Sequence, residues 1–209
     1  MIDLYTWNTP NGRKISVALE EMGLPYAVHT VNISEKQQFK PEFLKIAPNN
    51  RIPAIIDQDG PGGAPISVFE SGAILLYLAE KTGKFLPNDT RGRVEVLEWL
   101  MWQMGGFGPM PGQVHHFLMQ PEGPAREYGF QRYHTETRRL YGVLDRRLAG
   151  RNFVATANEP SIADFAILGW AWRHERHMVP FDDLPHVAAW YDRLMARPAV
   201  QRGFAIPLS

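Results

Sequence analysis

The sequence predicts an α+β fold in which a small domain of mixed strands and helices precedes a domain of helices alone. Three observations predict it. Apolar segments with strand-like alternation occur within residues 1–83. Residues 84–90 include Pro87 and the turn-forming Asn88-Asp89, as a linker does. Over residues 91–209 the apolar side chains recur at helical spacing. We therefore expect two domains, 1–83 and 91–209, joined by 84–90.

The first domain is predicted in the order β, α, β, α, β, β, α. A strand over residues 2–7 stops at the turn-forming segment 8–12, and the next segment carries apolar residues at helical spacing until Gly23 caps it. The remaining expected elements are a strand at 26–33, a short helix at 42–47, strands at 52–57 and 65–69, and a helix at 71–82.

The second domain is predicted to contain helices at 91–104, 127–148, 161–177 and 186–197. The glycine-rich run at 105–112 must interrupt or bend the first of them. Ser161 and Asp164 match a capping box before an apolar run, so we expect them to serve folding and not catalysis.

Composition excludes several classes of protein. The 22 basic and 22 acidic side chains create no overall field for nucleic acid or anionic lipid. The first residues lack the pattern of a secretory signal and no apolar stretch is long enough to span a membrane, so we expect a cytoplasmic protein. Cysteine is absent, which excludes disulfides, cysteine-bound zinc and a protein thiol as nucleophile. Any thiol must arrive on a ligand.

Three motifs together resemble the cytosolic glutathione transferases, and the resemblance covers nearly the whole chain. They are PNNRIPAI at 48–55, FESGAILLYL at 69–78 and PSIADF at 160–165. The loop 9–12 and the run GPMPGQVHHF are most similar to the bacterial Nu-class, disulfide-bond reductase branch. The resemblance implies a thioredoxin-like βαβαββα first domain that binds glutathione as co-substrate, an all-α second domain, and a homodimer.

Thr9 and Asn11 are the candidate catalytic residues. They lie where the first helix begins, so its unpaired N–H groups and its positive dipole end would stabilise a bound thiolate. A hydroxyl and an amide N–H₂ can both donate a hydrogen bond to sulfur. The alternative is that both are only turn and cap residues. Tyr5, within a strand, and Ser16, within the helix, are weaker candidates.

Two pairs of residues are candidates for binding the γ-glutamyl-cysteinyl part of glutathione. Ile52-Pro53 resembles the family's cis peptide, whose preceding residue pairs with the ligand as an added strand does. Its alternative is a trans-proline that opens a strand. Ser71 and the helix N–H groups around it suit the α-carboxylate, and Glu70 suits the α-ammonium. The alternative here is an ordinary serine cap beside an acidic residue.

Gln38 and Arg132 are further candidates that rest on the resemblance. Gln38 looks like a family contact to the peptide, and Arg132 resembles a Nu-class arginine near the glycine carboxylate; its alternative is a solvated surface charge. His115 and His116 are adjacent on a helix and do not face one site, so we expect no metal. They are expected to border the pocket for the second substrate.

The sequence predicts a glutathione-dependent disulfide-bond oxidoreductase that reduces small disulfides. Weak transferase or peroxidase activity is compatible with this prediction. Bound thiolate drives such exchange, and no protein cysteine is needed. One alternative is a glutathione S-transferase that conjugates electrophiles. Another is a non-catalytic binding module, which the intact Thr9, Asn11, Glu70 and Ser71 disfavour.

Overall fold

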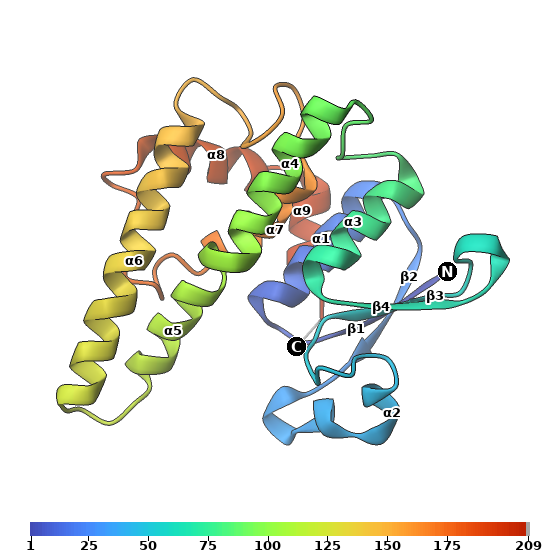
Figure 1. Ribbon diagram of the computed structural model, residues 1–209, viewed down its shortest axis with the longest axis horizontal. Coiled ribbons are helices and arrows are strands. Elements are labelled where there is room, and N and C mark those ends of the chain that lie inside the picture. The colour runs from blue at the N-terminus through green and yellow to red at the C-terminus, as the bar shows by residue number, and fades with distance from the viewer. Residues whose placement is uncertain (208–209) are drawn as a thin grey trace. The chain divides into compact units, whose positions relative to one another are not determined.

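Four short strands form one sheet in the spatial order β2-β1-β3-β4 (Figure 1). The first strand, β1 (Ile2–Thr6), runs parallel to β2 (Tyr26–Thr30) and antiparallel to β3 (Ala54–Asp57). β3 in turn pairs antiparallel with β4 (Ile66–Phe69). This sheet, with its helices, confirms the predicted order β, α, β, α, β, β, α.

The computed structural model describes residues 1–207, and its internal contacts divide them into two units. One unit is Met1–Leu86 together with the segment that begins at Met195, and the other is Pro87–Leu194. We expected all of residues 91–209 in the helical domain. In the structure the second unit begins at Pro87, within the predicted linker, and the segment from Met195 groups with the sheet-containing unit.

Helices cover both faces of the sheet. α1 (Pro10–Met22) and α3 (Ser71–Thr82) lie on one face and α2 (Pro41–Leu44) on the other (Figure 1). The predicted glycine caps are confirmed, since Gly23 and Gly83 follow α1 and α3 at φ 71° and 66°. Glycine adopts such left-handed backbone without the steric cost that a Cβ imposes.

The second strand is shorter than predicted. β2 ends at Thr30, and Ile33 begins a turn of 3₁₀ helix, η1 (Ile33–Glu35), which η2 (Gln37–Phe39) follows. The Asn32 side chain accepts a hydrogen bond from the Ser34 N–H at 3.0 Å. An asparagine that bonds to the backbone two residues ahead favours a turn over a strand, so the alternating pattern was overridden locally.

The second unit consists of helices in the described chain, as expected. They are α4 (Thr90–Trp102), the π-helical turn η4 (Gln103–Phe107), α5 (Pro109–Leu118), α6 (Pro124–Leu148), α7 (Ile162–Ala171) and α8 (Pro185–Met195). The glycine-rich run 105–112 thus covers the end of the π turn and the first residues of α5, a helix that the sequence did not predict. No helix among residues 1–207 has the length and apolar character needed to cross a membrane.

α7 ends earlier than predicted, at Ala171 and not at His177. The N–H groups of Arg173 and His174 bond three residues back, to Trp170 and Ala171, so the helix gives way to tighter turns. Its start is as predicted: Ser161 and Asp164 form the capping box, with the Ser161 N–H donating to Asp164 Oδ2 at 2.8 Å. The other Asp164 oxygen accepts from the Trp190 indole at 2.9 Å, which ties α7 to α8.

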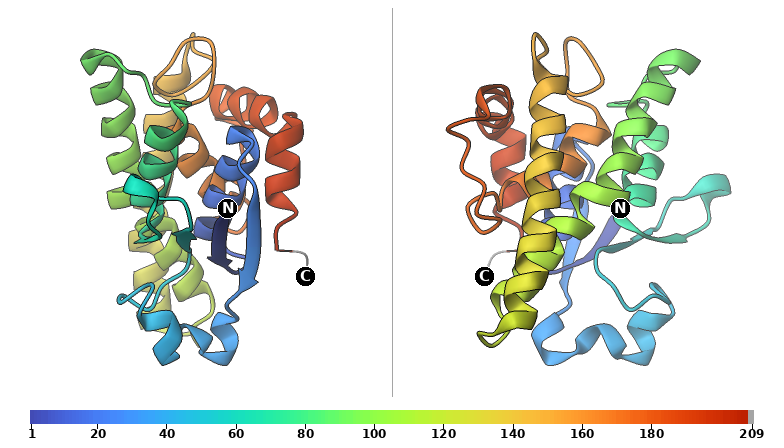
Figure 2. Two further views of the ribbon diagram at one scale, coloured as in Figure 1. Left: turned by 90° about the vertical axis from the view of Figure 1, so that its right-hand side faces the viewer. Right: turned by 60° about the vertical axis from the view of Figure 1, so that its left-hand side comes forward.

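A final helix, α9 (Pro198–Phe204), was not predicted from the sequence and packs against α1 (Figure 2, left). Ser16 Oγ donates to the Gly203 carbonyl at 2.7 Å. A Cβ on Gly203 would lie 2.5 Å from Val17 Cα, so only glycine allows this approach. Two ion pairs, Arg197 with Glu21 and Arg202 with Glu20, add charge-assisted bonds along the same contact.

The start of α1 is closely packed around Gly12. Its N–H donates to Thr9 Oγ1 at 3.1 Å, which makes Thr9 the N-cap of the helix. A Cβ on Gly12 would lie 2.5 Å from the Trp7 carbonyl oxygen and also collide with Thr6 Oγ1. The turn between β1 and α1 therefore depends on glycine at this position.

We predict that Gly12→Ala distorts this turn. Since backbone has to move, we expect a loss of about 1 to 3 kcal/mol in the free energy of unfolding, measured by urea titration. Gly105→Ala is the matched control, because a Cβ there meets nothing within 4 Å. Equal stability of the two variants would contradict the packing argument.

Candidate functional site

The sheet register gathers three predicted site segments at one end of the sheet. Tyr5 pairs with Ala54, and Ala54 pairs with Phe69. The loop after β1, the residues before β3 and the residues after β4 therefore leave the same end of the sheet. These are the segments that carry Thr9 and Asn11, Ile52-Pro53, and Glu70-Ser71.

Thr9 is the N-cap of α1, which was the alternative interpretation of this residue. The capping bond uses the hydroxyl oxygen as an acceptor and leaves the hydroxyl proton available for a ligand. Its oxygen accepts the Gly12 N–H at 3.1 Å, and its carbonyl accepts the Arg13 N–H. An oxygen that accepts can still donate its own O–H to a ligand. Pro10 has no N–H, so fewer backbone donors remain at this helix end than the sequence led us to expect.

Asn11 is the second residue of α1 and is partly exposed. It follows Pro10 and precedes the buried Gly12, so the same turn that carries the Thr9 hydroxyl also carries its amide. Both predicted sulfur donors therefore lie within the first turn of one helix.

The peptide bond between Ile52 and Pro53 is cis, as the resemblance implied. Pro53 is buried and Ile52 is partly buried against a small core of Val31, Phe43 and Ala47. β3 begins only at Ala54, so the main-chain groups of Ile52 lie outside the recorded pairing of β1 with β3. They are positioned where an extended peptide could be added at the end of the sheet.

Glu70 and Ser71 are not an ordinary helix cap. Glu70 occupies the N-cap position, with φ 70° and ψ 116°, and its side chain makes no capping bond to α3. A non-glycine residue with this backbone is strained, and such strain is concentrated at functional sites. The exposed carboxylate accepts instead from Asn49 Nδ2 at 3.4 Å, and Ser71 is the buried first residue of the helix.

Lys14 is a residue of this region that sequence reasoning missed. Its ammonium Nζ donates to Ser71 Oγ at 3.3 Å, and its side chain is fully buried. Burial lowers the pKa of Lys14 to about 7, although the nearby Glu70 carboxylate acts in the opposite direction. A signal was present: two basic residues, Arg13 and Lys14, follow each other near a helix N-terminus, where the dipole disfavours cations.

The weaker candidates have other contacts. Tyr5 stacks on His29 with ring centroids 4.7 Å apart, and burial followed by the Asp3 charge raises the pKa of Tyr5. With Phe43, both line a hollow of about 240 Å³ beside α2. The Ser16 hydroxyl is engaged with the Gly203 carbonyl.

Gln38 has an unsatisfied polar atom. Its Oε1 is buried without a hydrogen-bond partner in the described chain, while Nε2 makes a 3.5 Å contact to the Ile33 carbonyl. A buried acceptor without a donor requires an explanation, and a ligand N–H is a suitable one. This fits the predicted role of Gln38 as a contact to the peptide.

Arg132 belongs to the helical unit and is not brought together with these residues by the pairings described above. It is exposed on α6, where its charge, after that of Arg139, helps to lower the pKa of Glu136. Its role toward glutathione stays a prediction.

The two neighbouring histidines also lie in the helical unit. His115 stacks on His177 with ring centroids 4.8 Å apart, and burial lowers the pKa of His115 to about 4. His116 is exposed. Among residues 1–207 no group of three or more histidine or carboxylate side chains could hold a metal ion.

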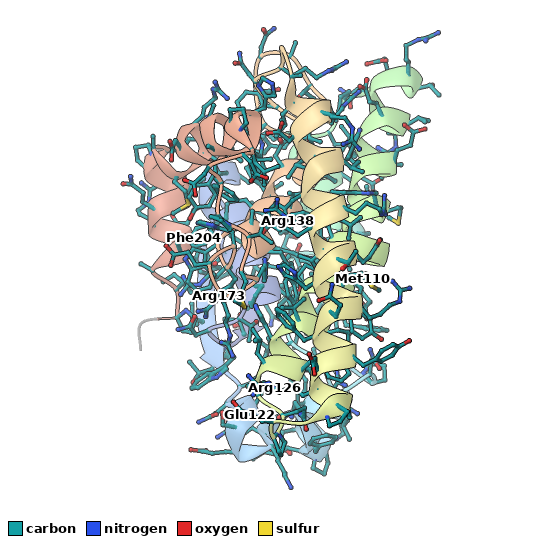
Figure 3. All side chains as sticks on the ribbon, turned by 90° about the vertical axis from the view of Figure 1, so that its left-hand side faces the viewer. Met110, Glu122, Arg126, Arg138, Arg173 and Phe204 are labelled. Carbon is teal, nitrogen blue, oxygen red and sulfur yellow. The ribbon has the colours of Figure 1, made fainter. Side chains whose placement is uncertain are left out.

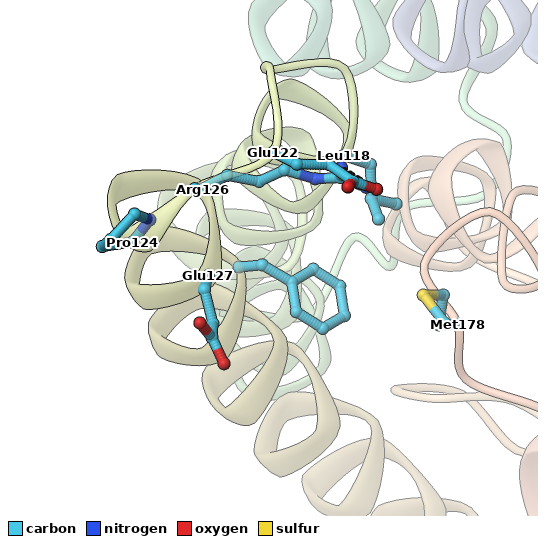
Figure 4. Close-up of a pocket in the computed structure, with 8 residues that line it drawn as sticks. Leu118, Glu122, Pro124, Arg126, Glu127 and Met178 are labelled. Carbon is cyan, nitrogen blue, oxygen red and sulfur yellow. Dashed lines mark hydrogen bonds and ion pairs between the residues drawn. The ribbon is translucent and has the colours of Figure 1, made fainter.

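The helical unit has a hollow of its own, of about 490 Å³, where α5 leads into α6 (Figure 4). Glu122 and Arg126 lie together on one side of it and form an exposed ion pair at 3.5 Å (Figure 3). Met178 lies across from them (Figure 4). The lining is Leu118, Glu122, Gly123, Pro124, Arg126, Glu127, Phe130 and Met178. None of the predicted site residues lines this hollow.

Comparison with known proteins agrees with this fold. Residues 2–80 match the N-terminal domain model of glutathione S-transferases, and residues 111–198 match the C-terminal domain model. The chain is 49% identical over 200 residues to the disulfide-bond oxidoreductase YfcG of Escherichia coli, covering 95% of this chain and 92% of that protein.

Two solved structures are similar over almost the whole chain. A glutathione transferase from Pseudomonas putida, with one glutathione disulfide bound per subunit, has a TM-score of 0.93 and 47% identity, covering 99% of this chain and 91% of that one. A family member from Pseudomonas fluorescens, with two glutathione bound, has a TM-score of 0.92 and 44% identity, covering 99% and 93%. The fold, the motifs and these relatives lead to one conclusion: the chain belongs to the glutathione S-transferase family.

Proposed function

We propose that the protein is a glutathione-dependent disulfide-bond oxidoreductase that reduces small disulfides. The observation that carries this proposal is the convergence of the Thr9-Asn11 turn, Ile52-Pro53 and Glu70-Ser71 at one end of the sheet. Because the chain has no cysteine, the reacting sulfur at such a site is that of glutathione.

The proposed reaction needs two molecules of glutathione. The bound thiolate attacks one sulfur of the disulfide, forms a mixed disulfide and releases one thiolate. A second glutathione thiolate then attacks the glutathione sulfur of the mixed disulfide and releases the other half of the substrate. One disulfide and two glutathione molecules thus become two thiols and one glutathione disulfide. The two electrons that reduce the substrate come from the two glutathione thiols, so no other reductant is needed.

The protein contributes thiolate stabilisation and positioning. The Thr9 O–H and the Asn11 amide donate to the sulfur, and both bonds are stronger when the sulfur is negatively charged. The main chain of Ile52 pairs with the cysteinyl unit and Gln38 with the peptide. Glu70 and Ser71 hold the two charged groups of the γ-glutamyl end, and Arg132 attracts the glycine carboxylate.

Relatives support disulfide exchange over conjugation. A protein 49% identical is a disulfide-bond oxidoreductase, and a homologue 47% identical holds glutathione disulfide. A site that accepts glutathione disulfide has room for a second sulfur beside the first, as exchange requires. Conjugation to an electrophile would use the same thiolate. Parallel turnover of bis(2-hydroxyethyl) disulfide and a chlorodinitrobenzene decides between them, and we expect the disulfide to be the better substrate.

We further propose a cytoplasmic homodimer. The cytoplasm keeps glutathione reduced, which supplies the thiol that this reaction consumes. The helical unit also presents exposed apolar side chains of the kind enriched at interfaces, among them Met101, Met119 and Tyr128.

The dimer predicts twice the mass of one chain of 23.8 kDa in solution. Light scattering coupled to size exclusion at micromolar concentration measures it directly. A single-chain mass at that concentration would refute the dimer. It would not bear on the proposed disulfide reduction.

We predict that Asn11→Ala slows disulfide reduction by at least tenfold while glutathione still binds. A hydrogen bond to a charged group contributes about 1.5 to 3 kcal/mol, or roughly 10- to 150-fold in rate. Because the lost bond favours the ionised thiol, the pKa of bound glutathione should rise and the pH–rate profile should move upward. Thr9→Ala should act in the same direction, with added loss of stability because Thr9 caps α1.

Asn88→Ala, at an exposed position before α4, serves as the control and should keep wild-type turnover. Wild-type activity and an unmoved profile in Asn11→Ala would place sulfur activation elsewhere. If the wild type itself does not reduce a small disulfide, the proposed function is wrong.

We predict that Glu70→Gln weakens reduced and oxidised glutathione alike. The variant keeps the shape of the side chain but removes the charge that faces the α-ammonium. The expected loss is about 1.5 to 3 kcal/mol of binding free energy, measured by calorimetry. Glu42→Gln, exposed on the short helix α2, controls for a general change in charge. Equal affinities for wild type and Glu70→Gln would remove Glu70 from the site.

A further inference from the structure

The turns that follow α7 meet one face of α5 at two points. The ring of His177 stacks on that of His115, with centroids 4.8 Å apart. The guanidinium of Arg176 donates to Met119 Sδ at 3.7 Å. His115 and Met119 are four residues apart at the end of α5, and a helix places such residues on one face. The two contacts therefore bring a histidine and an arginine of the turns to the same stretch of α5.

A second arginine, Arg173, belongs to the same group (labelled in Figure 3). The His177 N–H donates to the Arg173 carbonyl at 3.0 Å, so these two residues are one helical turn apart. Residues three and four positions apart on such a turn are neighbours, which places Arg173 beside both Arg176 and His177. Burial, followed by the Arg176 charge, lowers the pKa of Arg173. Two like charges thus lie close together on one side of the turns.

Within residues 1–207, the contacts of both guanidiniums are with neutral groups. Arg173 Cζ lies 3.9 Å from the centroid of the Trp172 ring, and Arg176 donates to the Met119 sulfur. Stacking uses the face of a guanidinium and leaves the N–H groups at its edge available. A thioether is only a weak acceptor. Both arginines therefore retain strong donors for a further partner.

The carboxylates nearest in sequence interact elsewhere. Asp183 forms an ion pair with Arg138 at 2.6 Å. Glu175 is exposed, and its charge, after burial and the charge of Asp192, raises the pKa of Tyr191. Neither carboxylate neutralises the two adjacent arginines.

The charges that act on the two histidines are also positive. Burial, followed by the charges of Arg176 and Arg173, lowers the pKa of His115 to about 4. Burial, followed by the charges of His115, His174, Arg173 and Arg176, lowers the pKa of His177 to about 2. Both rings are therefore neutral at pH 7 and add no positive charge of their own.

The hydrogen bond of His177 determines which of its ring nitrogens carries the hydrogen. The Tyr141 hydroxyl and His177 Nδ1 are 2.9 Å apart, and this is the hydroxyl's one hydrogen bond in the described chain. Burial raises the pKa of Tyr141 well above its usual value, so the hydroxyl keeps its proton and donates it to Nδ1. The hydrogen of the neutral ring is then on Nε2. That atom is buried without an acceptor among residues 1–207, and His115 Nε2 is buried without a partner as well.

We propose that Arg173, Arg176 and the His115–His177 pair form a binding site for a small oxyanion with two negative charges, such as a phosphate or sulfate group. The guanidinium edges bind its oxygens, and His177 Nε2–H donates a further hydrogen bond from the interior. Two adjacent cations favour a dianion over a single carboxylate. The site goes beyond the proposed function, since it requires neither glutathione nor a disulfide.

The first experiment follows the indole N–H signal of Trp172, assigned with Trp172→Phe, in proton–nitrogen NMR spectra at pH 7.5 and constant ionic strength. Inorganic phosphate, mainly a dianion at this pH, should shift the signal and bind more tightly than acetate. Arg173→Gln and Arg176→Gln should each weaken phosphate binding roughly tenfold or more, as for a lost bond between charged groups. Arg146→Gln, exposed on α6, is the matched control and should bind phosphate as the wild type does.

The second experiment uses the coupling of the site to His115. A bound dianion offsets the arginine charges, so the pKa of His115 should rise, by roughly one unit for a charge within about 6 Å. NMR of the His115 ring between pH 3.5 and 7 measures this with sulfate, whose charge changes little over that range. His177 and Tyr141 keep their charge state there, because their pKa values lie below and above the range. Sulfate affinity should increase as the pH falls through the raised pKa of His115.

Variants of Arg176 separate its charge from a structural role in the turns. In Arg176→Gln the pKa of His115 should rise without sulfate, because one cation has been removed, and sulfate should raise it further by less than in the wild type. Arg176→Lys keeps the cation and should retain the wild-type pKa of His115. An equal rise in both variants would contradict the charge argument.

The remaining outcomes are equally direct. Phosphate that leaves the Trp172 signal of the wild type unmoved, or that binds Arg176→Gln and wild type equally, overturns the site. Acetate that binds as tightly as phosphate overturns its assignment to a dianion. Sulfate that leaves the pKa of His115 unchanged removes the histidine pair from the site. None of these results bears on glutathione binding or disulfide reduction.

Discussion

The pairing of β3 with both β1 and β4 is the constraint on which the candidate site depends. Because Ala54 is opposite both Tyr5 and Phe69, three loops that are far apart in sequence leave the sheet side by side. A shift of one residue would turn the buried faces of these strands outward, so the hydrophobic core fixes the register. The packing that stabilises the unit thereby also sets the spacing between Thr9, Pro53 and Ser71.

Most of the first unit could be predicted because its signals are local. The ends of α1 and α3 follow from Thr9, Gly23 and Gly83, which act within one turn of the helix they limit. Helices later in the chain were predicted less well, because their ends and their existence depend on contacts with distant residues. α9 is short and has no side-chain cap, so its place against α1 rests on packing at Gly203 that no local pattern reveals.

Some residues of the candidate site could likewise be predicted from local sequence, and others could not. Glu70-Ser71 and Ile52-Pro53 were recognisable as motifs, and the strand pairing places both segments at one end of the sheet. Lys14 was missed although Arg13 and Lys14 follow each other near a helix start, because a lysine in such a helix usually extends into solvent. Its burial depends on the approach of α3, which brings Ser71 to it from 57 positions away. The role of Arg132 stays a prediction. Its expected partner is the glycine carboxylate of the ligand, and the contacts of Arg132 within its own helix do not indicate a ligand.

The return of α9 to α1 makes the sheet-containing unit discontinuous in the chain. The segment that completes the packing of α1 is synthesised after the whole helical unit. On the ribosome the helical unit, which is continuous, can therefore fold while α1 still has an uncovered face. The sheet-containing unit is completed only when α9 has emerged after the whole helical unit, so changes within α9 act on the unit that carries the glutathione site although a long stretch of chain separates them.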